Sequence, residues 1–332
     1  MPRLRWRLIS SFPRSLDTIY GNAEVFAERV LALTDGRLDI RSYPANEIVP
    51  YDQVLESVQK GTVQMGHAPS YYFKGKNPAL SFDCAVPFGL TARQYNAWVY
   101  HGGGLEILRG VFADFNVINF PVGNTGAQMG GWFRREIGSL EDLRGLRMRI
   151  PGLGGQVMEQ LGVNTQQIAG GEVYPALERG TIDAAEWVGP YDDEKLGFNK
   201  VAPYYYYPGW WEPGPGISLY VNRDAWDGLP QLYKEAITTA AASTNVAMLS
   251  SYDAKNPLAL QRLIDSGTEV RPFSNDIMEA AEASAFSIME EEAAADAGYN
   301  EVYQSFKAFR EASYRWFGTA EQTYAAYAFG SR

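Results

Sequence analysis

One stretch of the sequence occurs twice. Residues 54–72, VLESVQKGTVQMGHAPSYY, align without a gap on residues 173–191, VYPALERGTIDAAEWVGPY, and Gly61 coincides with Gly180 at an offset of 119 positions. Each copy has the pattern of an amphipathic helix, a Gly-Thr stop, a short apolar strand and a polar aromatic loop. This repetition predicts two similar α/β halves. The alternative is coincidence, because helix-glycine-strand units recur in all α/β proteins.

The repeat also indicates where a ligand would bind. Open parallel sheets bind ligands beyond the carboxyl ends of their strands. Residues 67–72 and 186–191 each follow such a strand directly. We therefore expect both loops to face a cleft between the two halves.

The amino-terminal region has the alternation of strand and helix that builds parallel sheets. Apolar residues alternate over 4–8, recur at helical spacing over 19–33 until TDG, and mark further strands at 38–40 and 63–65. A helix over 54–58 separates the last two strands. This order predicts a parallel sheet.

The carboxyl-terminal third is predicted to be helical. Residues 227–265 favour one long helix that passes both domains and breaks near Asn256, and residues 276–328 are again rich in helix formers. The chain ends in an aromatic series: Tyr314, Trp316, Phe317, Tyr324, Tyr327 and Phe329. An exposed aromatic stripe would indicate an interface, and packing against the chain's own domains is the equal alternative.

Size, charge and cysteine content exclude several classes of protein. A chain of 332 residues favours two domains, and a net charge of −10 argues against a nucleic-acid partner. Apolar runs fall short of the ~18 residues that a membrane span needs. The single cysteine, Cys84, excludes an internal disulfide and is expected to be buried. Because residues 1–12 enter a strand pattern directly, we expect either an intracellular protein or a removed leader peptide.

The sequence gives little support for nucleophilic catalysis. The only histidines are His67 and His101, and neither accompanies a G-x-S-x-G elbow. The HGGG motif at 101–104 is expected to open a helix instead. The glycines of 151–162 lack the full dinucleotide or P-loop pattern, so we expect no phosphate site there.

Two arginines alternate with apolar residues in LRMRIPG. Arg147 and Arg149 therefore lie on one face of a strand. A guanidinium at a strand end over a cleft can bind a carboxylate through two parallel hydrogen bonds. A solvated face, or an ion pair with Glu141 or Asp142, is an equal alternative.

Three oxygen-bearing side chains could hold a hard cation. Gln128 stands among small residues, and Glu186 and Glu212 supply carboxylates. An oxygen-only set suits Na⁺, Ca²⁺ or Mg²⁺ rather than zinc. The aromatic block 204–211 beside Glu212 is expected to pack a core or a hinge. The alternative is a carbohydrate-active enzyme that uses Glu186 and Glu212 as its carboxylate pair on an aromatic platform.

These pieces together resemble the substrate-binding proteins of tripartite ATP-independent periplasmic (TRAP) transporters, and most closely their α-keto-acid-binding receptors. The resemblance follows nearly the whole chain, in the family's order: GRLDIRSYPANEIVP, VLESVQKGTVQMG, LEDLRGLRMRIPG, ALERGTIDAAEWVGPYDD and GWWEPGP. The strands LRGLRMRIPG and GTIDAAE are its most specific parts.

The resemblance implies roles for particular residues. Arg149 matches the arginine that binds the ligand carboxylate, and Arg149→Ala would then lose binding with the fold kept. Gln128, the Glu186 side chain and the Trp187 carbonyl match groups around a bound Na⁺ or Ca²⁺ that bridges protein and substrate, with Glu212 as a further ligand.

The resemblance also implies which residues close the site. Tyr71 and Tyr72 correspond to residues that close over the ligand, and Asp192 and Asp193 could touch the site without being counted as part of it.

The resemblance also implies a fold and a function. The fold is α/β with two periplasmic-binding-protein-like domains, hinge strands, a domain-spanning helix and a helical tail. Domain I is expected over 1–122 and 215–252, domain II over 123–214 and 253–300, and the tail, a possible dimer contact, over 301–332.

The expected protein is not an enzyme but a periplasmic receptor for a pyruvate-like 2-oxo acid, homodimeric and partnered by TRAP membrane subunits. Its localisation assumes a removed leader peptide. Lactate-like 2-hydroxy acids, sugar acids and ectoine-like solutes are the alternative ligands.

Overall fold

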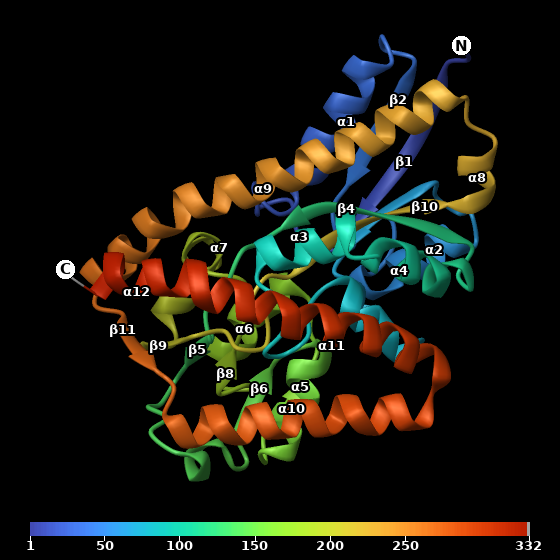
Figure 1. The fold of residues 1–332 in the computed structure, drawn as a ribbon. Helices are drawn as coiled ribbons and strands as arrows, with labels where there is room; N and C mark the ends of the chain where they lie inside the picture. Colours follow the sequence, from blue (N-terminus) through green and yellow to red (C-terminus); the bar gives the residue numbers. More distant parts are fainter. Residues whose placement is uncertain (331–332) are drawn as a thin grey trace.

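Two β-sheets form the framework of the molecule (Figure 1). The structure is a computed structural model and describes residues 1–330. The first sheet has the order β2-β1-β3-β10-β4. Its strands are β1 Leu4–Ser10, β2 Leu38–Tyr43, β3 Met65–Ala68, β4 Val117–Asn124 and β10 Gly216–Asn222.

The second sheet has the order β11-β9-β5-β8-β6-β7. Its strands are β5 Trp132–Phe133, β6 Arg147–Arg149, β7 Asn164–Gln166, β8 Ala184–Ala185, β9 Tyr204–Tyr207 and β11 Glu269–Pro272. Both copies of the internal repeat lie in equivalent places: β3 follows the helix of the first copy, and β8 follows the helix of the second. The predicted pair of α/β halves is confirmed.

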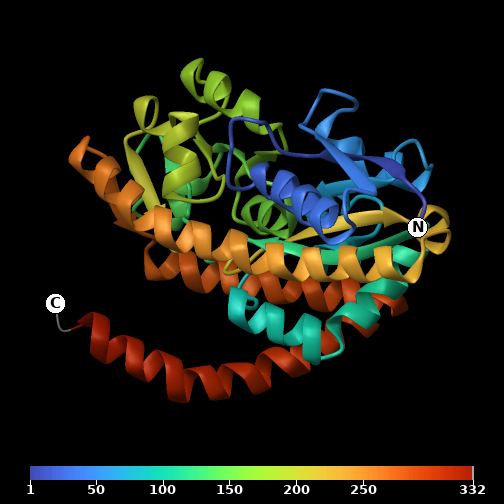
Figure 2. The same cartoon turned by 90° about the horizontal axis from the view of Figure 1, so that it is seen from above.

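Helices cover the sheets and form the carboxyl-terminal third (Figures 1 and 2). The helices that precede β9 are α1 Gly21–Leu33, α2 Val54–Gln59, α3 Ala92–His101, α4 Gly104–Ala113, α5 Gly152–Gln160, α6 Gly170–Glu178 and α7 Pro190–Leu196. The later ones are α8 Arg223–Asp227, α9 Gln231–Asp265, α10 Asn275–Ala295, α11 Ala297–Phe317 and α12 Thr323–Gly330. Short 3₁₀ turns lie between them, among them η1 Tyr51–Gln53, η2 Ser70–Phe73 and η3 Pro78–Asp83. As expected, the HGGG motif leads into a helix, α4.

The parallel sheet predicted for the amino-terminal strands is confirmed for β1, β2 and β3, whereas each complete sheet is mixed. β1 pairs in parallel with β2 and β3, but β10 is antiparallel to both β3 and β4. In the second sheet, β5 is antiparallel to β8 and β9. The antiparallel strands lie next to the points where the chain crosses from one sheet to the other, a connection that local periodicity does not report.

The chain crosses between the sheets through two extended segments and one helix. Residues 125–131 join β4 to β5, residues 208–215 join β9 to β10, and α9 leads from the first sheet towards β11. The residue boundaries expected for the two domains remain a prediction. Among residues 1–330, no helix is long and apolar enough to cross a membrane.

The predicted break near Asn256 is wrong. The helix α9 runs unbroken for 35 residues and contains Pro257. A proline in a helix interior removes one hydrogen bond, to the carbonyl four residues earlier. Here Tyr252, Ala259 and Leu263 remain buried on either side of it, so packing of the helix face outweighs the local cost.

Helices α10 and α11 fold back as a pair, and α11 continues through residues 318–322 into α12 (Figure 2). Phe306 and Tyr303 of α11 are buried against the core, whereas Trp316, Tyr324 and Phe329 are 61–77% exposed. The first half of the tail therefore packs into the core, whereas its second half keeps only surface contacts, such as that between Glu321 and Arg93.

Candidate ligand-binding site

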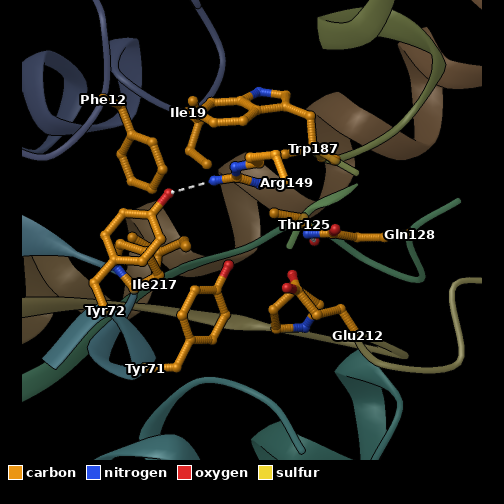
Figure 3. Close-up of a pocket in the computed structure, with 13 residues that line it drawn as sticks. Phe12, Ile19, Tyr71, Tyr72, Thr125, Gln128, Arg149, Trp187, Glu212 and Ile217 are labelled. Carbon is orange, nitrogen blue, oxygen red and sulfur yellow. Dashed lines mark hydrogen bonds between the residues drawn. The ribbon is translucent and has the colours of Figure 1, made fainter. Parts of the chain in front are cut away.

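A small cavity lies between the two sheets (Figure 3). It contains about 280 Å³ of space between atoms. Both sheets and both crossing segments contribute to its lining: Phe12, Ile19, Pro69, Tyr71, Tyr72, Thr125, Gln128, Arg149, Trp187, Val188, Glu212, Pro215 and Ile217. Both loops of the internal repeat thus meet at one cavity, as the repeat predicts.

Arg149 is the last residue of β6 and is 1% exposed. Its guanidinium donates to the Glu186 carbonyl at 2.8 Å and forms a short ion pair with the Glu186 carboxylate. It also donates to the Tyr72 hydroxyl at 3.2 Å, and its guanidinium carbon lies 4.8 Å from the ring centre of Trp187. The group is therefore fixed in position. Burial by itself lowers the pKa of Arg149, but the negative charge of Glu186 outweighs that effect and raises the pKa above its usual value.

The neighbouring arginine has a different environment. Arg147 is exposed and binds Asp183 through two parallel hydrogen bonds of 2.7 and 2.9 Å. The ion-pair alternative thus describes Arg147, although its partner is Asp183 and not Glu141 or Asp142. The two arginines share a face of β6, but only the end of the strand at Arg149 reaches the cavity. Their surroundings therefore differ.

Glu186 follows β8 directly and is fully buried. The backbone of Gly131 packs against it so closely that a β-carbon there would lie 2.7 Å from the carbonyl oxygen of Ala185. Gly131 also has a φ of +84°, which favours glycine. This close approach brings the first crossing segment against β8.

Gln128 and Glu212 come from the two crossing segments. The Gln128 amide donates to the Glu212 carbonyl at 3.2 Å, and the Gly209 amide donates to the Gln128 carbonyl at 3.0 Å. These backbone bonds hold the segments side by side. Both side chains are buried and line the cavity.

Three oxygens of these residues have no hydrogen-bond partner within residues 1–330. They are Oε1 of Gln128, Oε2 of Glu186 and Oε2 of Glu212, and all are buried. Buried polar atoms are nearly always satisfied, so each exception calls for a ligand, ion or water. An amide and two carboxylate oxygens fit a hard cation such as Na⁺ or Ca²⁺. No group of three His, Cys, Asp or Glu residues in this range could hold a metal by itself.

The charges around the cavity do not balance. Burial raises the pKa of Glu212 to about 7, against the lowering effects of Tyr71, Arg149 and Gln128. Burial likewise raises the pKa of Glu186, opposed by Arg149 and reinforced by Glu212. Two carboxyl groups share one guanidinium, so a proton or a cation is favoured at this place.

The two tyrosines expected to close over a ligand lie on η2. Tyr71 and Tyr72 pack edge to face with ring centres 5.3 Å apart, and both hydroxyls point towards the cavity (Figure 3). Tyr51, which the sequence did not single out, packs on Tyr72 at 5.4 Å and donates to the Gln167 carbonyl at 3.4 Å. These aromatic residues bring the first sheet against Arg149 and its neighbours.

Sequence reasoning missed the apolar wall of the cavity. Phe12, Ile19 and Ile217 line it, and isolated apolar residues near strand ends give no signal that separates them from the core. Thr125, in the same segment as Gln128, was within reach of the pattern and was not singled out.

Asp192 and Asp193, left outside the predicted site, do not line the cavity. Asp193 accepts hydrogen bonds from the Trp132 indole at 3.0 Å, the Tyr205 hydroxyl at 2.7 Å and the amides of Val188 and Gly189. It fixes the turn that follows Trp187.

This arrangement of fold and cavity belongs to a known family. Residues 9–296 match the model of DctP, the bacterial extracellular solute-binding proteins of family 7. The chain is a member of this family. The resemblance inferred from the sequence is confirmed.

Relatives of known structure or name share the full length of this DctP-family chain. It is 55% identical over 332 residues to the monocarboxylate 2-oxoacid-binding periplasmic protein of Nostoc sp., covering all of this chain and 91% of the relative.

A TRAP transporter solute-binding protein of Bordetella bronchiseptica is 48% identical with a TM-score of 0.98, covering 100% and 98% of the two chains. It is a dimer with calcium and picolinate in one site. One from Pseudoalteromonas atlantica, with bound sodium and pyruvate, is 39% identical with a TM-score of 0.94, covering 97% and 98%. The predicted two-domain fold is confirmed by these neighbours.

Proposed function

We propose that this chain is the extracytoplasmic receptor of a TRAP transporter for a small 2-oxo monocarboxylate such as pyruvate. One observation carries the proposal: a fixed guanidinium and the unpartnered oxygens of Gln128 and Glu212 belong to residues that line the same small cavity, and Glu186, which keeps a third unpartnered oxygen, lies directly behind it on Arg149. Arg149 would bind the ligand carboxylate. Gln128, Glu186, Glu212 and the Trp187 carbonyl would hold a bridging Na⁺ or Ca²⁺.

The chemistry of a 2-oxo acid fits this donor set. One carboxylate oxygen and the adjacent carbonyl oxygen can chelate a hard cation in a five-membered ring, which leaves the carboxylate with lone pairs for Arg149. The cation would also reverse the local sign of charge, so that a cavity with two carboxyl groups attracts an anion. Tyr71 and Tyr72 would cover the ligand from the first sheet.

The relatives support both the ligand class and the setting. The Nostoc relative is named for monocarboxylate 2-oxoacids and for the periplasm, and the Pseudoalteromonas neighbour holds sodium with pyruvate. A periplasmic location and membrane subunits of a TRAP transporter as partners follow by extension. A receptor of this family transfers its ligand unchanged, so we propose binding without catalysis.

The alternative ligands differ in size and in chelating group. A 2-hydroxy acid such as lactate would offer the same ring of oxygens, whereas a sugar acid or an ectoine-like solute would place polar groups against the apolar part of the lining. The apolar side chains of Phe12, Ile19 and Ile217 favour a short alkyl group next to the carboxylate.

Titration calorimetry tests the proposal. Protein freed of prebound ligand by unfolding, dialysis and refolding is titrated with pyruvate in Na⁺, in Ca²⁺ and with neither cation. We expect heat of binding that requires a cation, and weaker binding of lactate. No heat in any of the three conditions would contradict the proposed function.

We further propose a homodimer built on the carboxyl-terminal tail. Exposed Trp316, Tyr324 and Phe329 form an apolar surface, and the Bordetella neighbour is a dimer. Analytical ultracentrifugation should give a dimer for the full chain and a monomer after truncation following Phe317. A monomeric full chain at micromolar concentration would contradict the dimer.

A further inference from the structure

The internal repeat leads to an observation that ligand binding does not use. In the alignment of 54–72 on 173–191, Tyr72 corresponds to Tyr191. Tyr72 lies just after β3 of the first sheet, and Tyr191 lies just after β8 of the second. The two tyrosines therefore have equivalent places in the two halves.

Both tyrosines use their hydroxyls to reach a charged residue of the opposite half. The Tyr72 hydroxyl accepts from Arg149 at 3.2 Å, and Arg149 ends β6, the parallel neighbour of β8. The Tyr191 hydroxyl donates to Asp17 at 3.0 Å. Asp17 lies in the segment after β1, the parallel neighbour of β3. The two contacts are thus related by the same pseudo-symmetry as the repeat.

The surroundings of the two contacts differ. Tyr72 and Arg149 line the cavity, whereas Tyr191 and Asp17 do not. Asp17 is about half exposed. A ligand in the cavity would therefore meet the first contact directly and the second only through movement of the two halves.

Several groups converge on the outer contact. Lys195 of α7 forms an ion pair with Asp17, and the Lys255 ammonium of α9 donates to the Thr18 hydroxyl at 3.0 Å and lies 3.9 Å from the Asp17 carboxylate. Both ammonium groups also lie over the Tyr191 ring, at 4.5 and 4.6 Å from its centre.

A hydrogen bond to α9 fixes the backbone of Tyr191. The Tyr191 amide donates to the Asn256 side chain of α9 at 3.1 Å. Asp17 of the first half thus meets the Tyr191 hydroxyl and Lys195 of the second half, together with Lys255 of the helix that crosses between the sheets.

We propose that Asp17 and Tyr191 are positioning residues that hold the two halves closed without touching the ligand. This inference rests on the proposed receptor function and extends it to affinity and release. A contact made only in the closed arrangement raises the population of the binding-competent state, and apparent affinity scales with that population. Exposed ion pairs are individually weak, so the contact closes the halves reversibly.

Asp17→Asn tests the proposal, with Tyr191→Phe as a milder variant that removes only the hydroxyl. Glu194→Gln is the matched control, because it also removes one negative charge, that of a partly exposed carboxylate. Glu194 of α7 binds Arg262 of α9 at 2.6 and 2.9 Å, and these two helices pack against each other. The three variants are compared with the unaltered chain for pyruvate binding in Na⁺ or Ca²⁺.

We expect Asp17→Asn to weaken binding roughly three- to tenfold, which corresponds to about 0.7–1.4 kcal/mol. The change should lie mainly in the dissociation rate. The difference from the unaltered chain should shrink at high salt, because exposed charges are screened. A local structural role for Asp17 would show the same convergence, so the distance between the halves makes the distinction. Glu194→Gln should match the unaltered chain.

A second measurement distinguishes failure of the proposal for Asp17 and Tyr191 from failure of the proposed receptor function. Spin labels at Glu28→Cys on α1 and Glu178→Cys on α6, both exposed positions, report the distance between the halves; Cys84 is buried and does not compete for label. Asp17→Asn should shift the distance distribution relative to Glu194→Gln. If the unaltered chain does not bind pyruvate, the receptor proposal fails. These distances alone then test whether Asp17 and Tyr191 hold the two halves closed. If neither the distances nor the dissociation rate of pyruvate changes, the proposal for Asp17 and Tyr191 is overturned.

Discussion

Two buried carboxylate sites in this molecule have opposite environments. Asp83 is 2% exposed, and its carboxylate accepts from Asn119 at 2.8 Å, from Ser218 at 2.6 Å and from Ser70. Glu186 and Glu212 are equally buried, and each keeps one oxygen without a partner. Protein donors satisfy the Asp83 carboxylate, whereas Glu186 and Glu212 each keep an oxygen that an ion or a ligand could satisfy.

The first site supports the second. Ser70 binds Asp83 and directly precedes Tyr71 and Tyr72, so the Asp83 cluster ties the tyrosine turn to β4 and β10. Buried acids therefore have two roles in this molecule. Asp83 stabilises the wall of the cavity, and Glu186 and Glu212 are available for binding. Four changes would break or sharpen this comparison.

The largest effect is expected at Arg149. Arg149→Ala leaves Glu186 buried and unpaired, so the free energy of unfolding should fall by about 3–5 kcal/mol, and pyruvate binding should be lost. The sequence alone suggested an intact fold for this variant; the buried pair predicts a cost in stability as well. Urea unfolding and calorimetry measure the two effects.

A paired variant provides the control. Arg149→Met combined with Glu186→Gln removes both charges and should recover most of the stability without recovering binding. Binding by either variant would contradict the role given to Arg149.

The next effect concerns Asp83 and pH. Burial raises the pKa of Asp83 from 3.8 to about 6, so the folded protein binds this proton more tightly than the unfolded chain. The resulting stabilisation is fully present below about pH 4 and is lost as the pH rises through 6. It amounts to about 3 kcal/mol at most.

Urea unfolding of the unaltered chain and Asp83→Asn at pH 5 and pH 7.5 isolates this effect. The unaltered chain should gain stability relative to the variant at the lower pH. Parallel behaviour of the two proteins would show that Asp83 does not titrate in this range.

A smaller effect is expected at Glu212. Glu212→Gln keeps an oxygen and removes the charge, so cation-dependent pyruvate affinity should fall roughly ten- to a hundredfold, as for a lost charged hydrogen bond of about 1.5–3 kcal/mol. Titrating Na⁺ and Ca²⁺ at fixed pyruvate measures it. Asp83→Asn should keep its cation dependence, and an equal loss in both variants would remove the distinction drawn here.

The smallest effect is expected at Ser218. Ser218→Ala removes one of the donors to the Asp83 carboxylate and should lower the free energy of unfolding by about 1.5 kcal/mol at pH 7.5. The loss should be smaller at pH 5, where protonated Asp83 needs fewer donors. A loss that does not change with pH would indicate a packing effect instead.

Much of the fold was accessible to sequence reasoning. The spacing of apolar residues and the Gly-Thr stops predicted the helix-strand units that became α2-β3 and α6-β8, because these elements are determined by local periodicity. The direction of β5 and β10 and the continuity of α9 through Pro257 were not predicted. Each depends on packing with segments far away in the chain.

The candidate site was predicted in membership and not in geometry. The sequence singled out Arg149, Gln128, Glu186 and Glu212. The structure places Arg149, Gln128 and Glu212 around one cavity and Glu186 behind it, on Arg149. It gave no sign that Arg149 already pairs with Glu186. The contact between Tyr191 and Asp17 was equally invisible, since it joins residues 174 positions apart.

The sequence by itself determined the two α/β halves, their repeated loops and the set of oxygen and guanidinium groups that can meet a small acid. These follow from residue types and short-range spacing. Only the tertiary structure decided which charges are buried together, which oxygens lack partners and which surface groups join the halves. Burial and pairing depend on the two crossings of the chain between its sheets, and no local pattern encodes where those crossings bring distant residues into contact.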